Sequence, residues 1–453
     1  MNSDKYNPQN LGSDDLNSIN LSNNNFSNEE QGSNNFSSKE QSSGILFVEK
    51  QDSNNFSSKE QGSGSLSNEK QNSGNNHLKA QINSTPKKVV ISFLGNINYD
   101  TRAKNLVNSL TEMGHEVSTI SFDWIERPAG GNIKTIKLSK KWGSLFYYLK
   151  FLCVVTVKLI FNKYDFYIAS DIYNLPVLSF FATFRGKILF YDSRELFRYL
   201  AGLSGRQKVQ KFLARLESRY ITNCDKIVVT GEMDAESLIE DYGLPKEKFI
   251  LLRNLPIHQE NIKPFDLRGY YKIPQDATIL IYQGVVLRGR GLPILVDTLA
   301  EIGGKTYLVI VGDGDFRGET EQTAKEKGVS DRVIFTGSIP QEKILSYAAG
   351  ADIGCALIEN ISKSYYYALP NKLFEYIAAG IPVLCSDLPQ MKKVVESYEV
   401  GRVVNPGNLG EVVVAVAELS DPEVRAAIKE KALAAAQELN WDNEFQKVKG
   451  FFW

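Results

Sequence analysis

From Lys87 onward, short apolar runs of the buried-strand kind alternate with segments that have helical periodicity. The apolar run at 89–94, for example, is followed by helical spacing over 103–113. Strands joined by helical crossovers pair in parallel, with helices covering the sheet. The alternation loosens near residues 263–269 and restarts at 278–283. The pattern therefore predicts an α/β chain with two tandem Rossmann-like domains.

The first 86 residues follow a different pattern, with about one apolar residue in every five positions and a ten-residue repeat. The segment 33–41 recurs unchanged at 53–61. So few apolar residues cannot offset the entropy lost on folding, so we expect a disordered tail. It is either a dispensable expansion, which we favour, or a tether that binds a partner.

Four segments follow from these changes in pattern. We expect a disordered Asn/Ser/Gln-rich repeat tail at 1–86 and a first Rossmann-like domain at 87–258. A second Rossmann-like domain is expected at 259–436 and a C-terminal helix at 437–453.

Composition excludes several classes of function. The formal net charge of -1 gives no electrostatic reason to bind nucleic acid. Four scattered cysteines and three histidines contain no metal-ligand spacing, so no metal site is expected. The N-terminus lacks a basic start followed by an apolar core, so we expect a cytoplasmic protein.

Residues 142–161 are almost continuously apolar. Lys150 and Lys158 interrupt the run, and a charged residue near the bilayer centre costs roughly 2.5–3.5 kcal/mol. We therefore favour a helix that covers the sheet over a membrane span. An in-plane helix on a membrane surface stays open as the alternative.

Several polar residues of the first domain fall where predicted strands end. These positions matter because open α/β sheets bind ligands at the carboxyl edge. Gly95 and Thr230 follow strands, and Arg102 opens a helix where it could meet an anion. Asp171 and Glu195 are candidates for acceptor binding or proton transfer, although acidic residues there are also common helix caps.

The second domain carries a candidate phosphate surface. Gly284 and Gly312 end strands and permit close backbone approach, while Arg288 and Arg290 flank a further glycine. Guanidinium groups neutralise diphosphate, so this edge suits a nucleotide. Solvated loop arginines are the alternative.

A short helix follows the long loop at 359–369. Pro370 suits its first turn and Gly380 its left-handed stop. Lys372 and Glu375 lie three positions apart, near the electropositive helix start. They form either a surface ion pair or a phosphate and ribose contact.

Taken together, these motifs resemble the GT-B glycosyltransferases, and specifically the GT4-like nucleotide-sugar-dependent group. The resemblance covers 87–453 and rests on Gly95 with Asp100 and Arg102, Asp171, Tyr191–Phe197, Arg253–Pro256, Tyr282–Gly284, Gly289–Gly291, Val311–Gly314 and Pro370–Pro382. It implies that Glu375 holds the donor ribose and that Arg290 faces the diphosphate. It also implies that the final helix crosses back to the first domain.

The chain departs from the family pattern at three positions. Tyr367 stands where many members carry a glutamate eight residues before Glu375, and Val285 replaces a frequent basic residue. Arg194 stands where relatives often have histidine. The resemblance favours retention of configuration, yet Asp171 or Glu195 could act as the base of an inverting reaction.

The expected function is transfer of a hexose from a nucleotide diphosphate-sugar to a glycan or lipid-linked acceptor, in cell-surface polysaccharide synthesis. The nucleotide-sugar is a co-substrate, so no cofactor or metal is expected. The expected location is cytoplasmic, and contact with the inner face of the membrane through 142–161 stays open as the alternative. Expected donor-binding residues are Gly95, Gly284, Arg288, Arg290, Gly312, Tyr367, Asn371, Lys372 and Glu375, and expected acceptor-side residues are Arg102, Arg194 and Thr230. The alternatives are a nucleotide-sugar 2-epimerase and a non-catalytic binding protein.

Overall fold

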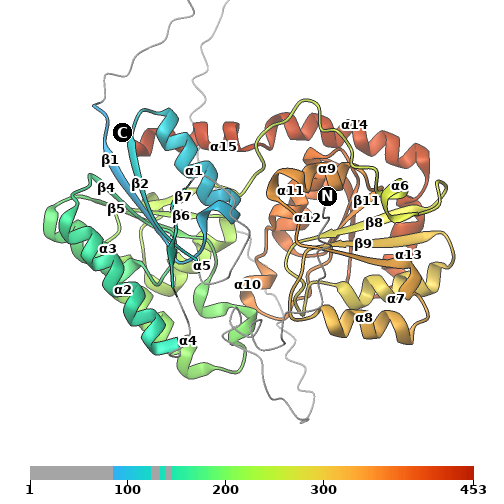
Figure 1. Cartoon of the computed structure of the whole chain (residues 1–453), viewed down its shortest axis with the longest axis horizontal. Coiled ribbons are helices and arrows are strands. Elements are labelled where there is room, and N and C mark those ends of the chain that lie inside the picture. Colours follow the sequence, from blue (N-terminus) through green and yellow to red (C-terminus); the bar gives the residue numbers. More distant parts are fainter. Residues whose placement is uncertain (1–84, 124–132, 139–143) are drawn as a thin grey trace, which may run out of the picture. The chain divides into compact units, whose positions relative to one another are not determined.

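The computed structural model describes residues 85–123, 133–138 and 144–453. The expected tail at 1–86 lies outside this part of the chain, apart from its last two residues. Residues Pro86 to Trp453 belong to one compact unit that contains two parallel sheets (Figure 1).

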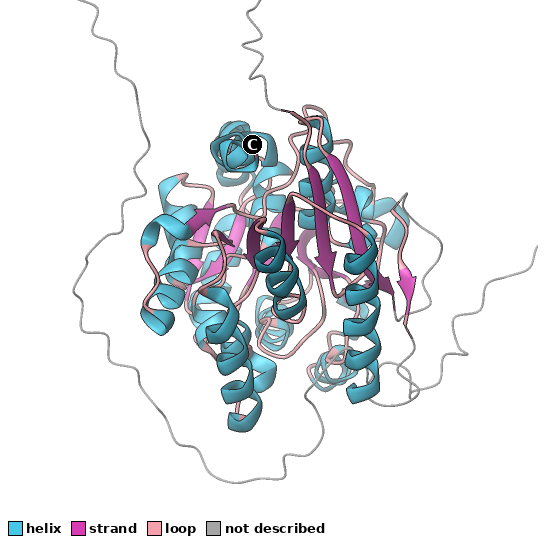
Figure 2. Cartoon of the chain, turned by 90° about the vertical axis from the view of Figure 1, so that its left-hand side faces the viewer, coloured by secondary structure: helices cyan, strands magenta, loops and turns pink. Residues whose placement is uncertain are grey.

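The first sheet has seven parallel strands in the order β3-β2-β1-β4-β5-β6-β7. Its strands are β1 Lys88–Phe93, β2 Glu116–Asp123, β3 Ile136–Lys137, β4 Phe166–Ala169, β5 Ile188–Ser193, β6 Lys226–Val229 and β7 Phe249–Leu251. Helices lie on both sides of the strands (Figure 2). The main helices are α1 Thr101–Glu112, α2 Ser144–Phe161, α3 Leu175–Arg185, α4 Gln207–Ile221 and α5 Glu232–Tyr242.

The second sheet has six parallel strands in the order β10-β9-β8-β11-β12-β13. Its strands are β8 Thr278–Gln283, β9 Thr306–Val311, β10 Val333–Gly337, β11 Ile353–Ala356, β12 Val383–Ser386 and β13 Gly401–Val404. The helices of this half are α6 Leu267–Tyr271, α7 Leu292–Ile302, α8 Arg317–Glu326, α9 Ile344–Ala349, α10 Lys363–Tyr366, α11 Asn371–Ala378, α12 Pro389–Ser397, α13 Leu409–Leu419 and α14 Pro422–Glu438.

The four inner strands of the second sheet, β8, β9, β11 and β12, are buried on both faces. Along β8, Ile279 and Ile281 belong to one apolar cluster, whereas Leu280 and Tyr282 belong to another. Successive strand residues point to opposite faces, so the two clusters are the two helix layers that cover this sheet. The predicted α/β architecture is confirmed for both halves.

The chain ends against the first sheet. Trp441, Phe445, Val448 and Phe452, from α15 Trp441–Val448 and the turn after it, share one apolar cluster with β1, β4 and β5. The Phe452 ring stacks on that of Phe190, with 4.8 Å between centroids. Figure 1 shows α15 in red beside the first sheet. The last residues of the chain thus complete the core of its first domain.

Helix α2 covers the first sheet, as the favoured interpretation of this apolar run predicts. Phe151, Val155 and Leu159 repeat every four residues and are fully buried. The Phe151 ring meets that of Phe122 in β2 at a centroid distance of 4.8 Å. Within the described residues, none of the helices has the length and apolarity that crossing a bilayer requires.

Candidate functional site

Helix α11 places Glu375 at the carboxyl edge of the second sheet. Pro370 stands at its N-cap, one position before the expected first turn, and Gly380 ends it with φ +70°. One side of α11 is buried through Leu373, Phe374, Tyr376 and Ile377. Their burial determines which side of the helix is left open. The Glu375 carboxylate accepts a hydrogen bond from Gln283 Nε2 at 3.1 Å. Burial raises the pKa of Glu375 to about 7, against the lowering effect of Lys372.

Lys372 is buried, so the interpretation as a surface ion pair does not hold. Its Nζ lies 3.6 Å from the centroid of the Tyr282 ring, a cation–π contact. Burial, followed by the charge of Arg290, holds the pKa of Lys372 well below its usual range. A Cβ added to Gly284 would lie 3.8 Å from the same Nζ. The ammonium group therefore lies under the first glycine loop of this domain.

Two loops meet backbone to backbone at this edge. Gly284 has φ +124° and Gly312 has φ +141°, values that L side chains rarely adopt. A Cβ on Gly312 would lie 1.9 Å from the Gly284 carbonyl oxygen. Both glycines are therefore required by the fold of the edge itself. Arg288 is exposed on the adjoining loop.

Arg290 lies between this edge and the first domain. Its guanidinium carbon is 4.5 Å from the centroid of the Tyr365 ring in α10. Its charge acts on Lys372 and also on Glu195 of the first domain. Glu195 as a residue is exposed, but the protein around its carboxyl group excludes water and so raises its pKa. The positive charges of Arg290 and Arg194 lower the pKa and oppose this rise. The charge of Arg290 in the second domain thus acts on the Glu195 carboxyl of the first domain.

A pocket of about 140 Å³ opens beside Glu375. Asn371 and Glu375 line one side, and another is lined by Asn98, in the turn before α1, and by Thr101 and Lys104 at the start of α1. Gln341, which also hydrogen-bonds Glu375, completes this wall. Sequence reasoning did not single out Gln341 or Gln283 as individual side chains, although Gln283 lies inside a motif that carried the resemblance.

Arg102 and Arg194 are committed to a buried ion network in the first domain. Arg102 Nη2 lies 2.7 Å from Asp192 Oδ1, and its Nη1 donates to the Leu252 carbonyl. Arg194 binds Asp192 through Nε at 3.1 Å and Asp100 through Nη1 at 2.6 Å. Arg102 is 2% exposed, and its charge pairs with the Asp192 carboxylate inside the domain rather than facing solvent.

Asp171 is held at the carboxyl end of β4. Its carboxylate accepts hydrogen bonds from the backbone N–H groups of Leu94 (2.7 Å) and Asn174 (2.8 Å) and from Asn174 Nδ2 (2.6 Å). Burial raises the pKa of Asp171, although these hydrogen bonds oppose the rise. The ring of Tyr148 stacks on Tyr173 with centroids 5.4 Å apart, and the Asp171 charge acts on both phenols. The two tyrosines were not predicted, because only the fold brings them together.

The remaining candidates have local partners. Gly95 accepts hydrogen bonds from Ser121 Oγ and from the Phe122 backbone N–H, inside the first domain. Thr230 donates to Asp234 at 3.0 Å, and burial raises the pKa of Asp234 to about 7. The Tyr367 carbonyl accepts from the Gln390 side chain.

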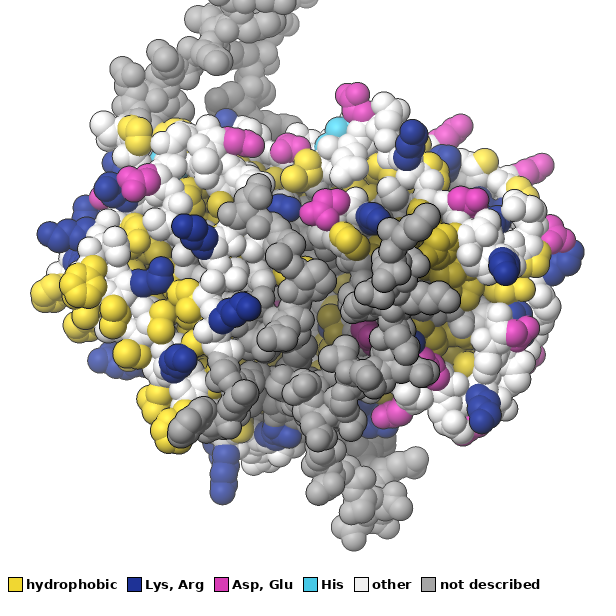
Figure 3. Space-filling view, viewed as in Figure 1, with side chains coloured by type: hydrophobic (Ala, Val, Ile, Leu, Met, Phe, Trp, Pro, Cys, Tyr) yellow, Lys and Arg dark blue, Asp and Glu magenta, His cyan; other side chains and the backbone are white. Residues whose placement is uncertain are grey.

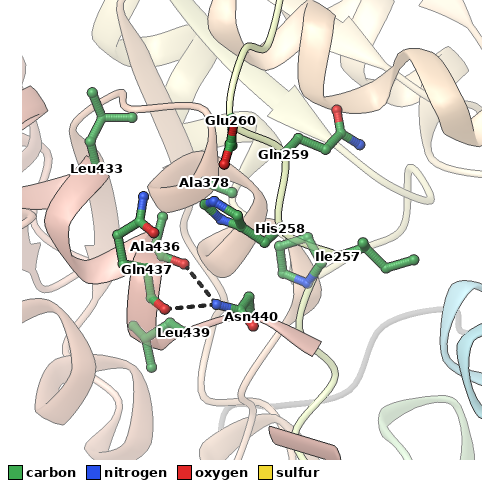
Figure 4. Close-up of a pocket in the computed structure, with 11 residues that line it drawn as sticks. Ile257, His258, Gln259, Glu260, Ala378, Leu433, Ala436, Gln437, Leu439 and Asn440 are labelled. Carbon is green, nitrogen blue, oxygen red and sulfur yellow. Dashed lines mark hydrogen bonds between the residues drawn. The ribbon is translucent and has the colours of Figure 1, made fainter. Parts of the chain in front are cut away.

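A second, smaller pocket lies where the inter-domain segment 256–260 meets α14 and the start of α15 (Figure 4). Its volume is about 40 Å³. Asn440 Nδ2 donates there to the carbonyls of Ala436 and Gln437. None of the predicted site residues lines it, so we assign it to the chain crossing between domains. In the described part of the chain, no group of three or more His, Cys, Asp and Glu side chains is placed to hold a metal ion.

Residues 266–434 match the family model of glycosyl transferases group 1. A D-inositol 3-phosphate glycosyltransferase of Acidothermus cellulolyticus is 24% identical over 254 residues, which cover 52% of this chain and 54% of that protein. The alpha-D-kanosaminyltransferase of Streptomyces kanamyceticus is 29% identical over 37% of this chain and 42% of its own length. The chain thus spans about half the length of these curated relatives.

Solved structures match over a larger part of the chain. Sucrose-phosphate synthase from Thermosynechococcus elongatus superposes with a TM-score of 0.66 at 18% identity, covering 81% of this chain and 98% of its own. Anabaena HepE in complex with UDP-glucose gives 0.65 at 16% identity, covering 81% and 99%. The family match in the second domain and the fold shared with these structures together support a GT-B, GT4-like glycosyltransferase.

Proposed function

We propose that the protein transfers a sugar from a nucleotide diphosphate-sugar to a glycan or lipid-linked acceptor. The observation that carries the proposal is the pair formed by Glu375 and Lys372. A carboxylate that opens into a pocket and a buried ammonium group under a glycine loop lie one helical turn apart. Ribose hydroxyls donate hydrogen bonds, whereas a diphosphate needs positive charge. One short helix supplies both.

The donor would lie along the edge of the second sheet. Glu375 accepts hydrogen bonds from the ribose hydroxyls, and Asn371 lines the same pocket. Lys372 and Arg290 neutralise the diphosphate, and Arg288 adds charge from the adjoining loop. Because these cations supply the charge, we expect transfer to proceed without a divalent metal ion. The check is an unchanged rate in the presence of a chelator.

The acceptor would lie against the first domain. The Tyr148 and Tyr173 rings offer an apolar face next to Asp171, and Glu195 lies opposite Arg290. In the transfer, the bond from the anomeric carbon to the diphosphate oxygen breaks and a bond to the acceptor oxygen forms. The acceptor hydroxyl proton passes to the departing diphosphate oxygen, and the nucleoside diphosphate is released. We propose retention, and proton NMR of the anomeric proton in the product tests it.

The similar proteins support this assignment. Their names describe glycosyl transfer to inositol phosphate and, in Streptococcus pneumoniae, synthesis of alpha-monoglucosyldiacylglycerol. HepE binds UDP-glucose. The shared chemistry is a nucleotide-sugar donor and a polar or lipid-linked acceptor.

The test begins with a thermal-shift screen of nucleoside diphosphates and their sugars, because a ligand bound by the folded state alone raises the midpoint. Calorimetry with the best ligand then compares Glu375→Ala with Glu430→Ala, an exposed glutamate on α14. We expect only the first variant to lose affinity. Equal affinity of both variants would refute the ribose assignment. An isomerised donor without released nucleoside diphosphate would favour the 2-epimerase instead.

A further inference from the structure

Three consecutive helices of the first domain expose large apolar side chains. Figure 3 shows hydrophobic side chains at the left margin, over α2 and α3, with lysines and arginines among them. We call this set the apolar face; its members are Phe146, Leu149, Val157, Ile160, Phe161, Phe180, Phe184, Val209 and Phe212. Phe161 is 81% exposed and Phe184 is 78% exposed. Isolated exposed apolar residues are ordinary, but a contiguous group of this kind marks a binding surface.

Helix α2 is apolar on two sides, and the sheet uses only one of them. Phe151, Val155 and Leu159 face the core, whereas Leu149, Val157 and Ile160 face outward. On α3, the exposed rings of Phe180 and Phe184 stack one turn apart with centroids separated by 6.0 Å. A helix that is apolar all round is normally covered all round. The outward side therefore lacks a cover in the described residues.

The charges on these helices have a single sign at the surface. Lys150 and Lys158 are exposed on α2, and α4 exposes Lys208, Lys211, Arg215 and Arg219. The single acidic residue in the sequences of α2, α3 and α4 is Glu217. It is fully buried and accepts hydrogen bonds from Tyr191 and Tyr242. On these three helices, the surface charges next to the apolar face are therefore all positive.

Apolar side chains with flanking cations fit an anionic lipid bilayer. The apolar groups enter the boundary between headgroups and acyl chains, and each Lys or Arg near the surface adds electrostatic attraction. A second copy of the chain is a poorer occupant, because pairing two such faces would bring like charges together. Charge complementarity thus selects the lipid surface.

We propose that α2, α3 and α4 dock the protein in the plane of an anionic lipid surface through the apolar face. The docking does not involve the donor site, so it can be tested independently of sugar transfer. Helix α2 also connects the apolar face with the proposed acceptor side near Asp171. Tyr148 at its start stacks on Tyr173 beside Asp171, and Phe161 at its end is exposed. If sugar transfer is also established, the acceptor of this chain is carried by the same lipid layer.

The experiment is co-sedimentation of the full chain with phosphatidylcholine vesicles, with or without phosphatidylglycerol. We expect binding to the anionic vesicles alone, weakened by salt. The double variants Phe180→Ser/Phe184→Ser and Lys208→Glu/Lys211→Glu should each bind at least about tenfold more weakly. Matched controls on the other domain are Val414→Ser, which is 68% exposed in the parent, and Lys325→Glu/Lys429→Glu, both exposed.

Circular dichroism and the thermal midpoint show that each variant is folded before binding is compared. Wild-type protein that stays in solution with anionic vesicles would overturn the proposal. Variants that bind like the wild type would do the same. A wild-type dimer in sedimentation that Phe180→Ser/Phe184→Ser converts to a monomer, without vesicle binding, would show that a second copy covers the apolar face.

Discussion

The ammonium nitrogen of Lys372 lies 3.6 Å from the centroid of the Tyr282 ring. The aromatic face offers the cation partial compensation for lost water, yet the pKa of Lys372 still falls well below its usual range because the group is buried. A buried cation that lacks full compensation costs stability. Such groups are retained where a ligand needs them.

Lys372→Met should therefore separate stability from function. Methionine fills similar space against Tyr282 without the buried charge, so we expect an unchanged or higher thermal midpoint. We expect nucleotide-sugar affinity to fall by about tenfold or more, since a charged hydrogen bond contributes roughly 1.5–3 kcal/mol. Calorimetry and thermal denaturation on the same preparation measure both quantities. A variant with lower stability and full affinity would show that Lys372 is only structural.

The raised pKa of Glu375, about 7, predicts a pH dependence of donor binding. Ribose hydroxyls donate to the ionised carboxylate, so affinity should rise as the pH increases through about 7. The ligand should be a nucleotide-sugar, because the terminal phosphate of a nucleoside diphosphate titrates near the same pH. In Glu375→Gln this rise in affinity with pH should disappear. A step of equal size in the variant would assign the titration to another group.

The same group predicts the sign of a stability change in the free protein. The folded pKa of Glu375 lies above the ordinary value of 4.5, so the folded state binds this proton more tightly than the unfolded state does. The stability that Glu375 protonation adds to the folded state is fully present below pH about 4.5, and it is lost as the pH rises through about 7. Urea unfolding of wild type and Glu375→Gln across this window isolates the difference.

The sequence specified the strands and the strand-end positions well, because buried apolar runs and glycines are local signals. It predicted that Gly284 and Gly312 follow directly after strands, and in the structure they follow β8 and β9. It gave a loop for 359–369, where the structure has α10, because four helical residues are too short to show a period. Ser362, whose side chain caps the backbone N–H of Tyr365, was the available local signal.

Local sequence patterns did not predict which side chains contact each other. Arg102 was expected to face an anion, but its partner Asp192 lies ninety positions away in sequence. The stacking of Tyr148 on Tyr173 likewise depends on packing between α2 and the end of β4. Spacing predicts which residues reach an edge of a sheet. It does not predict which of them bind each other there.

The C-terminal return gives a sharp stability test with a neighbouring control. Phe452 is 1% exposed and stacks on Phe190, whereas Phe451 is 43% exposed. Phe452→Ala should lower the free energy of unfolding by about 3–5 kcal/mol, because it opens a cavity in the first domain. Phe451→Ala should change it by less than about 1 kcal/mol. Equal effects in denaturant titrations would mean that the chain end does not complete this core.

Asp192 tests whether the buried ion network is structural. Although burial alone would raise its pKa, the charges of Arg102 and Arg194 lower it, so the carboxylate stays ionised between two guanidinium groups. Asp192→Asn leaves Arg102 buried without its counter-charge and leaves Arg194 with Asp100 alone, which should cost about 3–5 kcal/mol in the free energy of unfolding.

The matched control for Asp192→Asn is Glu418→Gln, which breaks the exposed pair with Arg402 and should cost about 1 kcal/mol or less. Chemical denaturation measures both variants. We expect donor affinity to be unchanged in Asp192→Asn at temperatures where it is folded, because Asp192 is 1% exposed and its oxygens are occupied by the two arginines. A folded, equally stable variant with impaired transfer would instead place this network in the acceptor site, because only a direct contact with the reacting groups would then explain the loss.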